Sequence, residues 1–250
     1  MPTPIQHLAI ADQLLRDNTL PGSIRDRLID QRGAFLFGNT APDVQTVSGQ
    51  PREATHFFDI PLRSTQPAHL KLFELHPGLA HARSLSPAQA AFIAGYICHL
   101  LLDVLWVRDI YQPGFGPDAK WATMHERLVY HNILRAWCDR NDQRKLNGDT
   151  GSSLAVLYPH HWLPFTADRF LIQWRNVLVD QFRPGASIRT IEVFAARNNV
   201  SPEEFQRVLD SPLEMDAYIF AHSSQKDIKT FYQRGYDQMA ELMVDYFRPA

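Results

Sequence analysis

The sequence contains little cysteine and almost no excess charge. Among 250 residues there are two cysteines, Cys98 and Cys138, and the formal net charge is −2 at pH 7. The cysteines form no C-x-x-C motif and nothing requires a disulfide, so we expect a protein of a reducing, cytoplasmic compartment. The near-balanced charge gives no general electrostatic reason to bind nucleic acid or an anionic membrane, and we expect no nucleic-acid partner.

Other patterns are also missing. The sequence has no alternating strand pattern, no glycine-rich phosphate loop and no internal repeat. The first residues, MPTPIQHLAIADQ, lack the basic segment and apolar core of a signal peptide, so we expect none. Since helical periodicity is all that remains, and the chain is long enough for a sizeable core, we predict one all-α domain over residues 1–250.

Helix start signals and apolar spacing recur along the chain. Ser86-Pro87, for example, places an N-cap residue directly before a proline in the first helical turn. We expect polar loops at residues 111–118 and 141–153. The predicted helices cover residues 4–15, 23–31, 68–75, 86–107, 120–139, 168–182, 187–198, 201 onward and 225–247.

One of these helices carries an unusual pair of polar residues. The stretch AAFIAGYICHLLLDVLWV, residues 90–107, is apolar except for His99 and Asp103. Residues four apart stack on one face of a helix. A carboxylate in such a stretch is costly unless it is paired or bound to a metal. The two residues are therefore either a satisfied buried pair or part of a site for a divalent ion.

The same stretch is about long enough to cross a bilayer. Asp103 lies well inside it, however, where a charge is expensive in lipid. Ser86-Pro87 begins the stretch and Arg108-Asp109 closes it, as in a helix of a soluble protein. We therefore predict the central helix of a soluble all-α protein, and no transmembrane segment.

Histidine is plentiful, with eleven residues, so metal ligands here would be histidine and carboxylate. Four short motifs contain such residues in order: H-L-A-x-A, G-N-T-A-P-D, A-T-H-F-F and G-Y-I-C-H-L-L-L-D. Together they resemble the zinc-dependent phospholipase C family, to which the secreted P1-type nucleases are related. The resemblance covers residues 1–140, whereas residues 141–250 match only as further helices. The candidate ligands in the motifs are His7, Asp43, His56, His99 and Asp103.

The resemblance implies an all-α, multi-helix bundle around a buried metal site, and cleavage of phosphodiester bonds. It also implies that Asp43, His56, His99 and Asp103 bind one metal ion. Asp103 is then expected to bridge to a second metal ion, where His7 is also a ligand. Asp43 takes a second, catalytic role in this interpretation, because it orients the attacking water.

The chain departs from the family pattern in three places. Secreted members use a mature N-terminal tryptophan as a ligand, whereas this chain has Met1, so we expect that ligand to be absent. A third family metal uses a histidine where this chain has Asp109, followed by a His-x-x-x-Glu pair where it has His125 and Val129. We therefore expect this site to be altered or lost, with Asp109, His125 and His131 as candidates for a substitute.

The expected function is a metal-dependent hydrolase of a phosphodiester or phospholipid-like substrate. We expect one to three zinc ions. A hydroxide bound to one of them would be the nucleophile. Two alternatives stay open. The same scaffold could use iron or manganese for a reaction on a small molecule, because histidine and carboxylate ligands accept those metals. It could also be a non-enzymatic, metal-stabilised helical protein that binds a partner.

Overall fold

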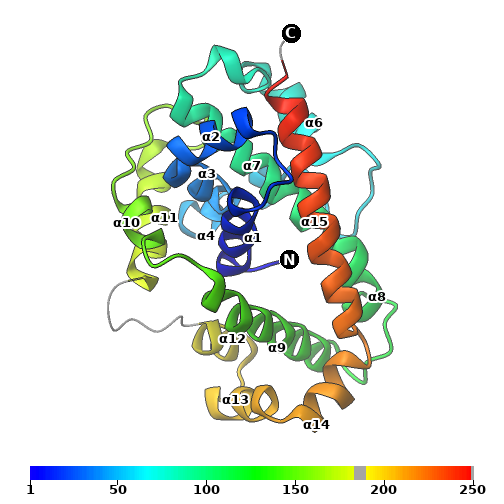
Figure 1. Cartoon of the computed structure of the whole chain (residues 1–250). Helices are drawn as coiled ribbons and strands as arrows, with labels where there is room; N and C mark the ends of the chain where they lie inside the picture. The colour runs from blue at the N-terminus through cyan, green and yellow to red at the C-terminus, as the bar shows by residue number, and fades with distance from the viewer. Residues whose placement is uncertain (183–189, 249–250) are drawn as a thin grey trace.

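The computed structural model describes residues 1–182 and 190–248, and all regular secondary structure in these ranges is helical (Figure 1). The all-α prediction is confirmed, while the expected start of a helix at residue 187 lies outside the described residues. The α-helices are α1 (Pro4–Arg16), α2 (Gly22–Asp30), α3 (Arg32–Gly38), α4 (Gln45–Ser48), α5 (Glu53–His56), α6 (Ala68–Leu75), α7 (Pro87–Trp106), α8 (Gln112–Phe115), α9 (Met124–Asp142), α10 (Thr150–Ala155), α11 (Asp168–Gln181), α12 (Thr190–Asn198), α13 (Pro202–Asp210), α14 (Pro212–Glu214) and α15 (Gln225–Tyr246).

Helix α7 is the core of the fold. It begins as predicted, because the hydroxyl of Ser86 accepts a hydrogen bond from the backbone N–H of Gln89 and Pro87 occupies the first turn. Helices α3, α6 and α15 pack against it. The helical segment Pro87–Phe115 is long and apolar enough to cross a membrane, but 89% of its most apolar window is buried inside the protein. Such burial is typical of a core helix.

The chain does not leave the helix after Val107, so the predicted loop over residues 111–118 is wrong in its first half. A π-helical turn, η4 (Val107–Tyr111), leads directly into α8. Ile110 and Phe115 are buried, and this burial keeps the segment against the core. The shift of hydrogen bonding in η4 comes just before Pro113, which has no N–H to continue the helical ladder.

Two further boundaries differ from the predictions. Helix α9 begins at Met124 rather than at residue 120, because the hydroxyl of Thr123 caps it by accepting from the N–H of Glu126. The stretch 141–153, predicted as loop, contains the end of α9 and the first residues of α10.

Helices α3 and α7 approach very closely through two glycines. A Cβ atom on Gly38 would lie 2.0 Å from the carbonyl oxygen of Phe92, and one on Gly95 would lie 2.1 Å from the carbonyl oxygen of Phe35. Neither position has room for a methyl group, because the obstacle is backbone. The contact holds the end of α3, and with it Asn39, against α7.

We expect Gly95→Ala to lower the free energy of unfolding by about 1–3 kcal/mol, because the added methyl group must separate two packed backbones. Alanine is the better helix former by about 1 kcal/mol, so a loss of stability would show that the clash outweighs helix propensity. Urea denaturation measures the difference. Gly22→Ala is the matched control, since Gly22 begins α2 with nothing within 4 Å of the added atom. Similar effects of the two substitutions would contradict the packing argument.

Candidate metal centre

Four segments bring the five candidate ligands together. His7 lies on α1, Asp43 on the 3₁₀ turn η1 (Ala41–Val44), His56 at the end of α5, and His99 and Asp103 on α7. The ligand atoms form two groups, each with all atoms within 4.8 Å of one another. One group is His7, His99 and Asp103; the other is Asp43, His56 and His99. His99 belongs to both, so the two groups form one cluster.

The carboxylate of Asp103 lies at the centre of the cluster. Its Oδ1 is 3.3 Å from Nε2 of His7, whereas its Oδ2 is 3.5 Å from Nε2 of His56 and 3.7 Å from Nε2 of His99. A second carboxylate, on Asp43, lies 3.6 Å from Nε2 of His56. The two oxygens of Asp103 therefore face different histidines, as a residue that bridges two ions requires.

In two of the histidines, the Nδ1 atom lies within hydrogen-bond distance of a neighbouring oxygen atom. Nδ1 of His99 is 2.8 Å from the carbonyl oxygen of Asn39, and Nδ1 of His56 is 3.0 Å from the hydroxyl of Thr55. A hydrogen bond at Nδ1 to a carbonyl fixes the ring so that Nε2 carries the lone pair. The Nε2 atoms of these rings face each other at 3.3 Å, an arrangement suited to sharing an ion.

Several polar atoms of the cluster lack hydrogen bonds although they are buried. Both ring nitrogens of His7 and Oδ1 of Asp103 have no hydrogen-bond partner. Buried polar groups are normally satisfied, so these atoms need a further partner. Imidazole nitrogens and carboxylate oxygens are the donors that zinc accepts in proteins. The residues therefore fit a zinc ion.

The protonation states also suit metal binding. Burial lowers the pKa of His7 to about 4 and also lowers the pKa of His56, so both rings are neutral at pH 7. Burial acts to raise the pKa of Asp103, but His99, His7 and Arg52 outweigh it and hold that pKa well below its usual range. For Asp43, the neighbouring imidazoles of His56 and His99 outweigh burial and lower the pKa to about 2. Neutral imidazoles and ionised carboxylates are the ligating forms.

Asp109 and His125, also predicted as ligands, lie outside both groups found among the described residues. Asp109 belongs to the π-helical turn η4 and pairs instead with Arg234 on α15, at 3.1 Å. His125 is exposed in the first turn of α9. His131 is buried, and its Nε2 accepts a hydrogen bond from the indole of Trp106 at 3.0 Å. The structure therefore does not assemble these residues into a substitute site.

Arg52 is a member of the cluster that the sequence analysis missed. Its guanidinium donates to Oδ2 of Asp103 at 2.7 Å, and its carbonyl oxygen lies 3.3 Å from Nδ1 of His56. The available signal was its spacing, four residues before a candidate ligand, which puts both on one side of a helical turn.

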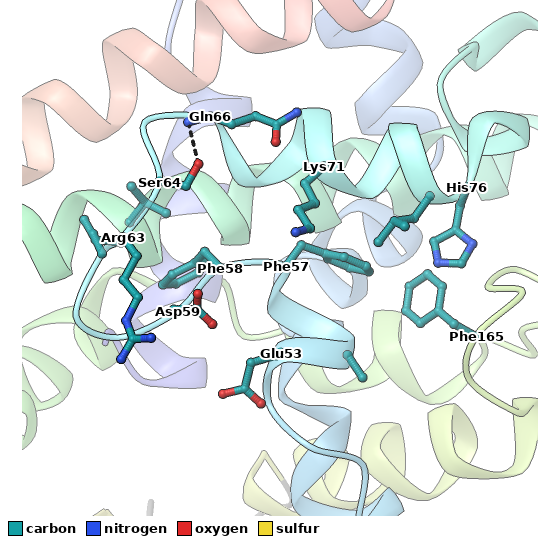
Figure 2. Close-up of a pocket in the computed structure, with 14 residues that line it drawn as sticks. Glu53, Phe57, Phe58, Asp59, Arg63, Ser64, Gln66, Lys71, His76 and Phe165 are labelled. Atoms are coloured by element: carbon teal, nitrogen blue, oxygen red, sulfur yellow. Dashed lines mark hydrogen bonds between the residues drawn. The ribbon is translucent and has the colours of Figure 1, made fainter.

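A pocket of about 340 Å³ opens beside the cluster, between α5 and α6 (Figure 2). Phe58 connects the two, because it lines the pocket while its ring lies edge-on to His56 at 6.2 Å. Two basic residues, Lys71 and Arg63, and two acidic residues, Glu53 and Asp59, also line the pocket, and Lys71 points into it from α6 (Figure 2). The apolar lining consists of Ala54, Phe57, Phe58, Leu62, Leu75, Val104 and Phe165.

Residues 6–112 match the model of the zinc dependent phospholipase C family. The matched range contains all five residues of the two ligand groups and ends in α8. No curated protein and no solved structure matches the chain. Over residues 6–112, the chain is therefore similar to the zinc-dependent phospholipase C family.

Proposed function

We propose that the protein is a zinc-dependent hydrolase that cleaves the phosphodiester bond of a phospholipid-like substrate. The observation that carries the proposal is the arrangement around Asp103, where three imidazoles approach both oxygens of one buried carboxylate. Arg52 pairs with Oδ2 of this carboxylate, but Oδ1 is buried without a hydrogen-bond partner, and the neighbouring imidazoles are ligands that zinc uses. The similarity of residues 6–112 to the zinc-dependent phospholipase C family supports the same choice of metal.

Bound zinc supplies a Lewis acid and lowers the pKa of a water molecule to about 7. The chain's own residues then have separate tasks. His7, His56, His99 and Asp103, whose side chains are at most 1% exposed, would hold the metal. Asp43 is 21% exposed and ionised, so it can orient a water molecule and accept its proton.

The pocket beside α5 supports a phospholipid-like substrate. Its aromatic and aliphatic walls suit the apolar part of an amphiphile, and its charged residues, Glu53, Asp59, Arg63 and Lys71, suit a polar headgroup. Because Phe58 lines this pocket and its ring also contacts that of His56, a substrate held there would lie next to the cluster.

The experiment is a metal titration of the metal-free protein, with bis(4-nitrophenyl) phosphate and phosphatidylcholine assayed in parallel. We expect zinc to restore hydrolysis and to saturate below three ions per chain, because the described residues gather no third ligand set. With fewer ions to stabilise developing charge, the activated diester should be cleaved much faster than phosphatidylcholine.

Three tightly bound zinc ions with fast phosphatidylcholine cleavage would contradict the expected stoichiometry. Higher turnover with iron or manganese would favour another metal-dependent reaction. Tight zinc binding without hydrolysis of either diester would favour a metal-stabilised binding protein.

A further inference from the structure

Two residues of the cluster are partly exposed to solvent. Its four most buried candidate ligands are at most 1% exposed. In contrast, the side chain of Asp43 is 21% exposed and that of Arg52 is 19% exposed. A substrate that reaches the cluster would therefore meet these two residues, one an anion and the other a cation. Since a phosphodiester is itself an anion, the cation is the residue that it would contact favourably.

Neighbouring residues fix the position of the Arg52 guanidinium but do not use all of its hydrogen-bond donors. One of its terminal N–H groups donates to Oδ2 of Asp103 at 2.7 Å, and its guanidinium carbon lies 4.5 Å from the centroid of the Phe58 ring. Its Nε is buried without a hydrogen-bond partner. A guanidinium has five N–H donors in a fixed plane, so this one keeps donors available while stacking fixes its orientation.

The position of Arg52 follows from a very short helix. Arg52 is the residue before α5, and His56 is its last residue. A spacing of four puts both side chains on the same side of the turn. The single turn therefore places both a candidate metal ligand, His56, and a cation, Arg52, beside the carboxylate of Asp103. Phe58, two residues further along the chain, lines the pocket.

We propose that Arg52 binds the phosphate group of the substrate at the metal centre. This inference rests on the proposed function. Arginine recognises phosphate through paired, charge-assisted N–H···O bonds, and charge on the non-bridging oxygens must be stabilised while a phosphodiester reacts. Asp103 can keep its hydrogen bond from Arg52 while it binds a metal, because a carboxylate oxygen has more than one lone pair.

The test uses inorganic phosphate as the probe and zinc-loaded protein. Phosphate affinity is measured by calorimetry for the wild type, Arg52→Gln and Arg52→Lys. Zinc affinity is measured separately by competition with a chromophoric chelator. We expect Arg52→Gln to weaken phosphate binding by about 10- to 100-fold, the usual effect of losing hydrogen bonds to a charged group. Arg52→Lys should lose less, because it keeps the charge but not the planar fork. Zinc affinity should not fall in either variant.

Arg83→Gln is the matched control, since Arg83 is exposed on the 3₁₀ turn η3 (Ala82–Ser84) and the charge change is the same. It should leave phosphate affinity within about 2-fold. Unchanged phosphate affinity in zinc-loaded Arg52→Gln, or an equal loss in the control, would overturn the inference. If that variant lost zinc affinity alone, Arg52 would only position Asp103. Should the zinc-loaded wild type neither hydrolyse a diester nor bind phosphate, the proposed function would fail as well.

Discussion

Zinc should raise the melting temperature of the metal-free protein by about 8–16 °C, and Asp103→Asn should remove most of that increase. The ligands come from α1, η1, α5 and α7, so the ion binds the folded chain and not the unfolded one. A ligand at 1,000 times its Kd stabilises the folded state by about 4 kcal/mol. In a domain of this size, each kcal/mol corresponds to about 2–4 °C. The measurement is thermal unfolding with and without zinc.

Asp139→Asn provides the matched control for this substitution. Asp139 is also a buried aspartate, but it accepts a hydrogen bond from Thr190 and lies outside both ligand groups. Its variant should keep the zinc-dependent increase. Equal melting temperatures of the wild type with and without zinc, once metal loading and removal are verified, would refute the metal centre.

The zinc-dependent increase in melting temperature should also persist to a lower pH than it would with histidine ligands of ordinary pKa. Protons compete with zinc for the ring nitrogens, and an unperturbed histidine becomes protonated near pH 6.5. The pKa of His7 is lowered to about 4, so this ring stays available to zinc until the pH approaches that value. Melting curves from pH 8 to 4 would follow the loss.

Asp43→Asn should reduce kcat/KM for a diester by about 100- to 10,000-fold while leaving a zinc-dependent increase in stability. An amide cannot take a proton from water, and general-base groups typically contribute a factor of this size. Asp43 belongs to one ligand group, whereas the group of His7, His99 and Asp103 does not need it. Steady-state kinetics and thermal unfolding of the same preparation measure both effects.

The comparable surface change is Asp26→Asn, at an exposed aspartate on α2. It should leave kcat/KM unchanged. If zinc-loaded Asp43→Asn kept nearly wild-type kcat/KM, Asp43 could not be the residue that orients the water.

Of the candidate ligands, His99 and Asp103 could be predicted from a local pattern, whereas His7, Asp43 and His56 were predicted from the family resemblance. His99 and Asp103 are the polar residues of an otherwise apolar helix, and their spacing alone puts them on one face. Arg52 could not be found in this way. It lies in a polar stretch, where an arginine is normally solvated, and its contact with Asp103 exists only because α5 reaches α7 from 51 positions away in sequence.

The boundary after α7 shows a different limit. Glycine and proline in YQPGFGPD predict a loop, but the burial of Phe115 and Ile110 against the core overrides that local preference. The resulting π-helical turn directs Asp109 toward Arg234 on α15. The resemblance to a family covers residues before α15, so it could not predict the contact between Asp109 and Arg234.

Helix α7 has a consequence for the protein's biosynthesis. One of its faces is covered by α15, which is the long red helix at one side of Figure 1: Gly235 lies against Leu102, and the sulfur of Met243 is 3.9 Å from that of Cys98. The ribosome makes α15 after all other helices described here. Until then, the nascent chain exposes part of a segment with a mean hydropathy of 1.9. Transiently exposed apolar surface makes an incompletely folded chain prone to aggregation, and α15 removes this surface when it covers α7.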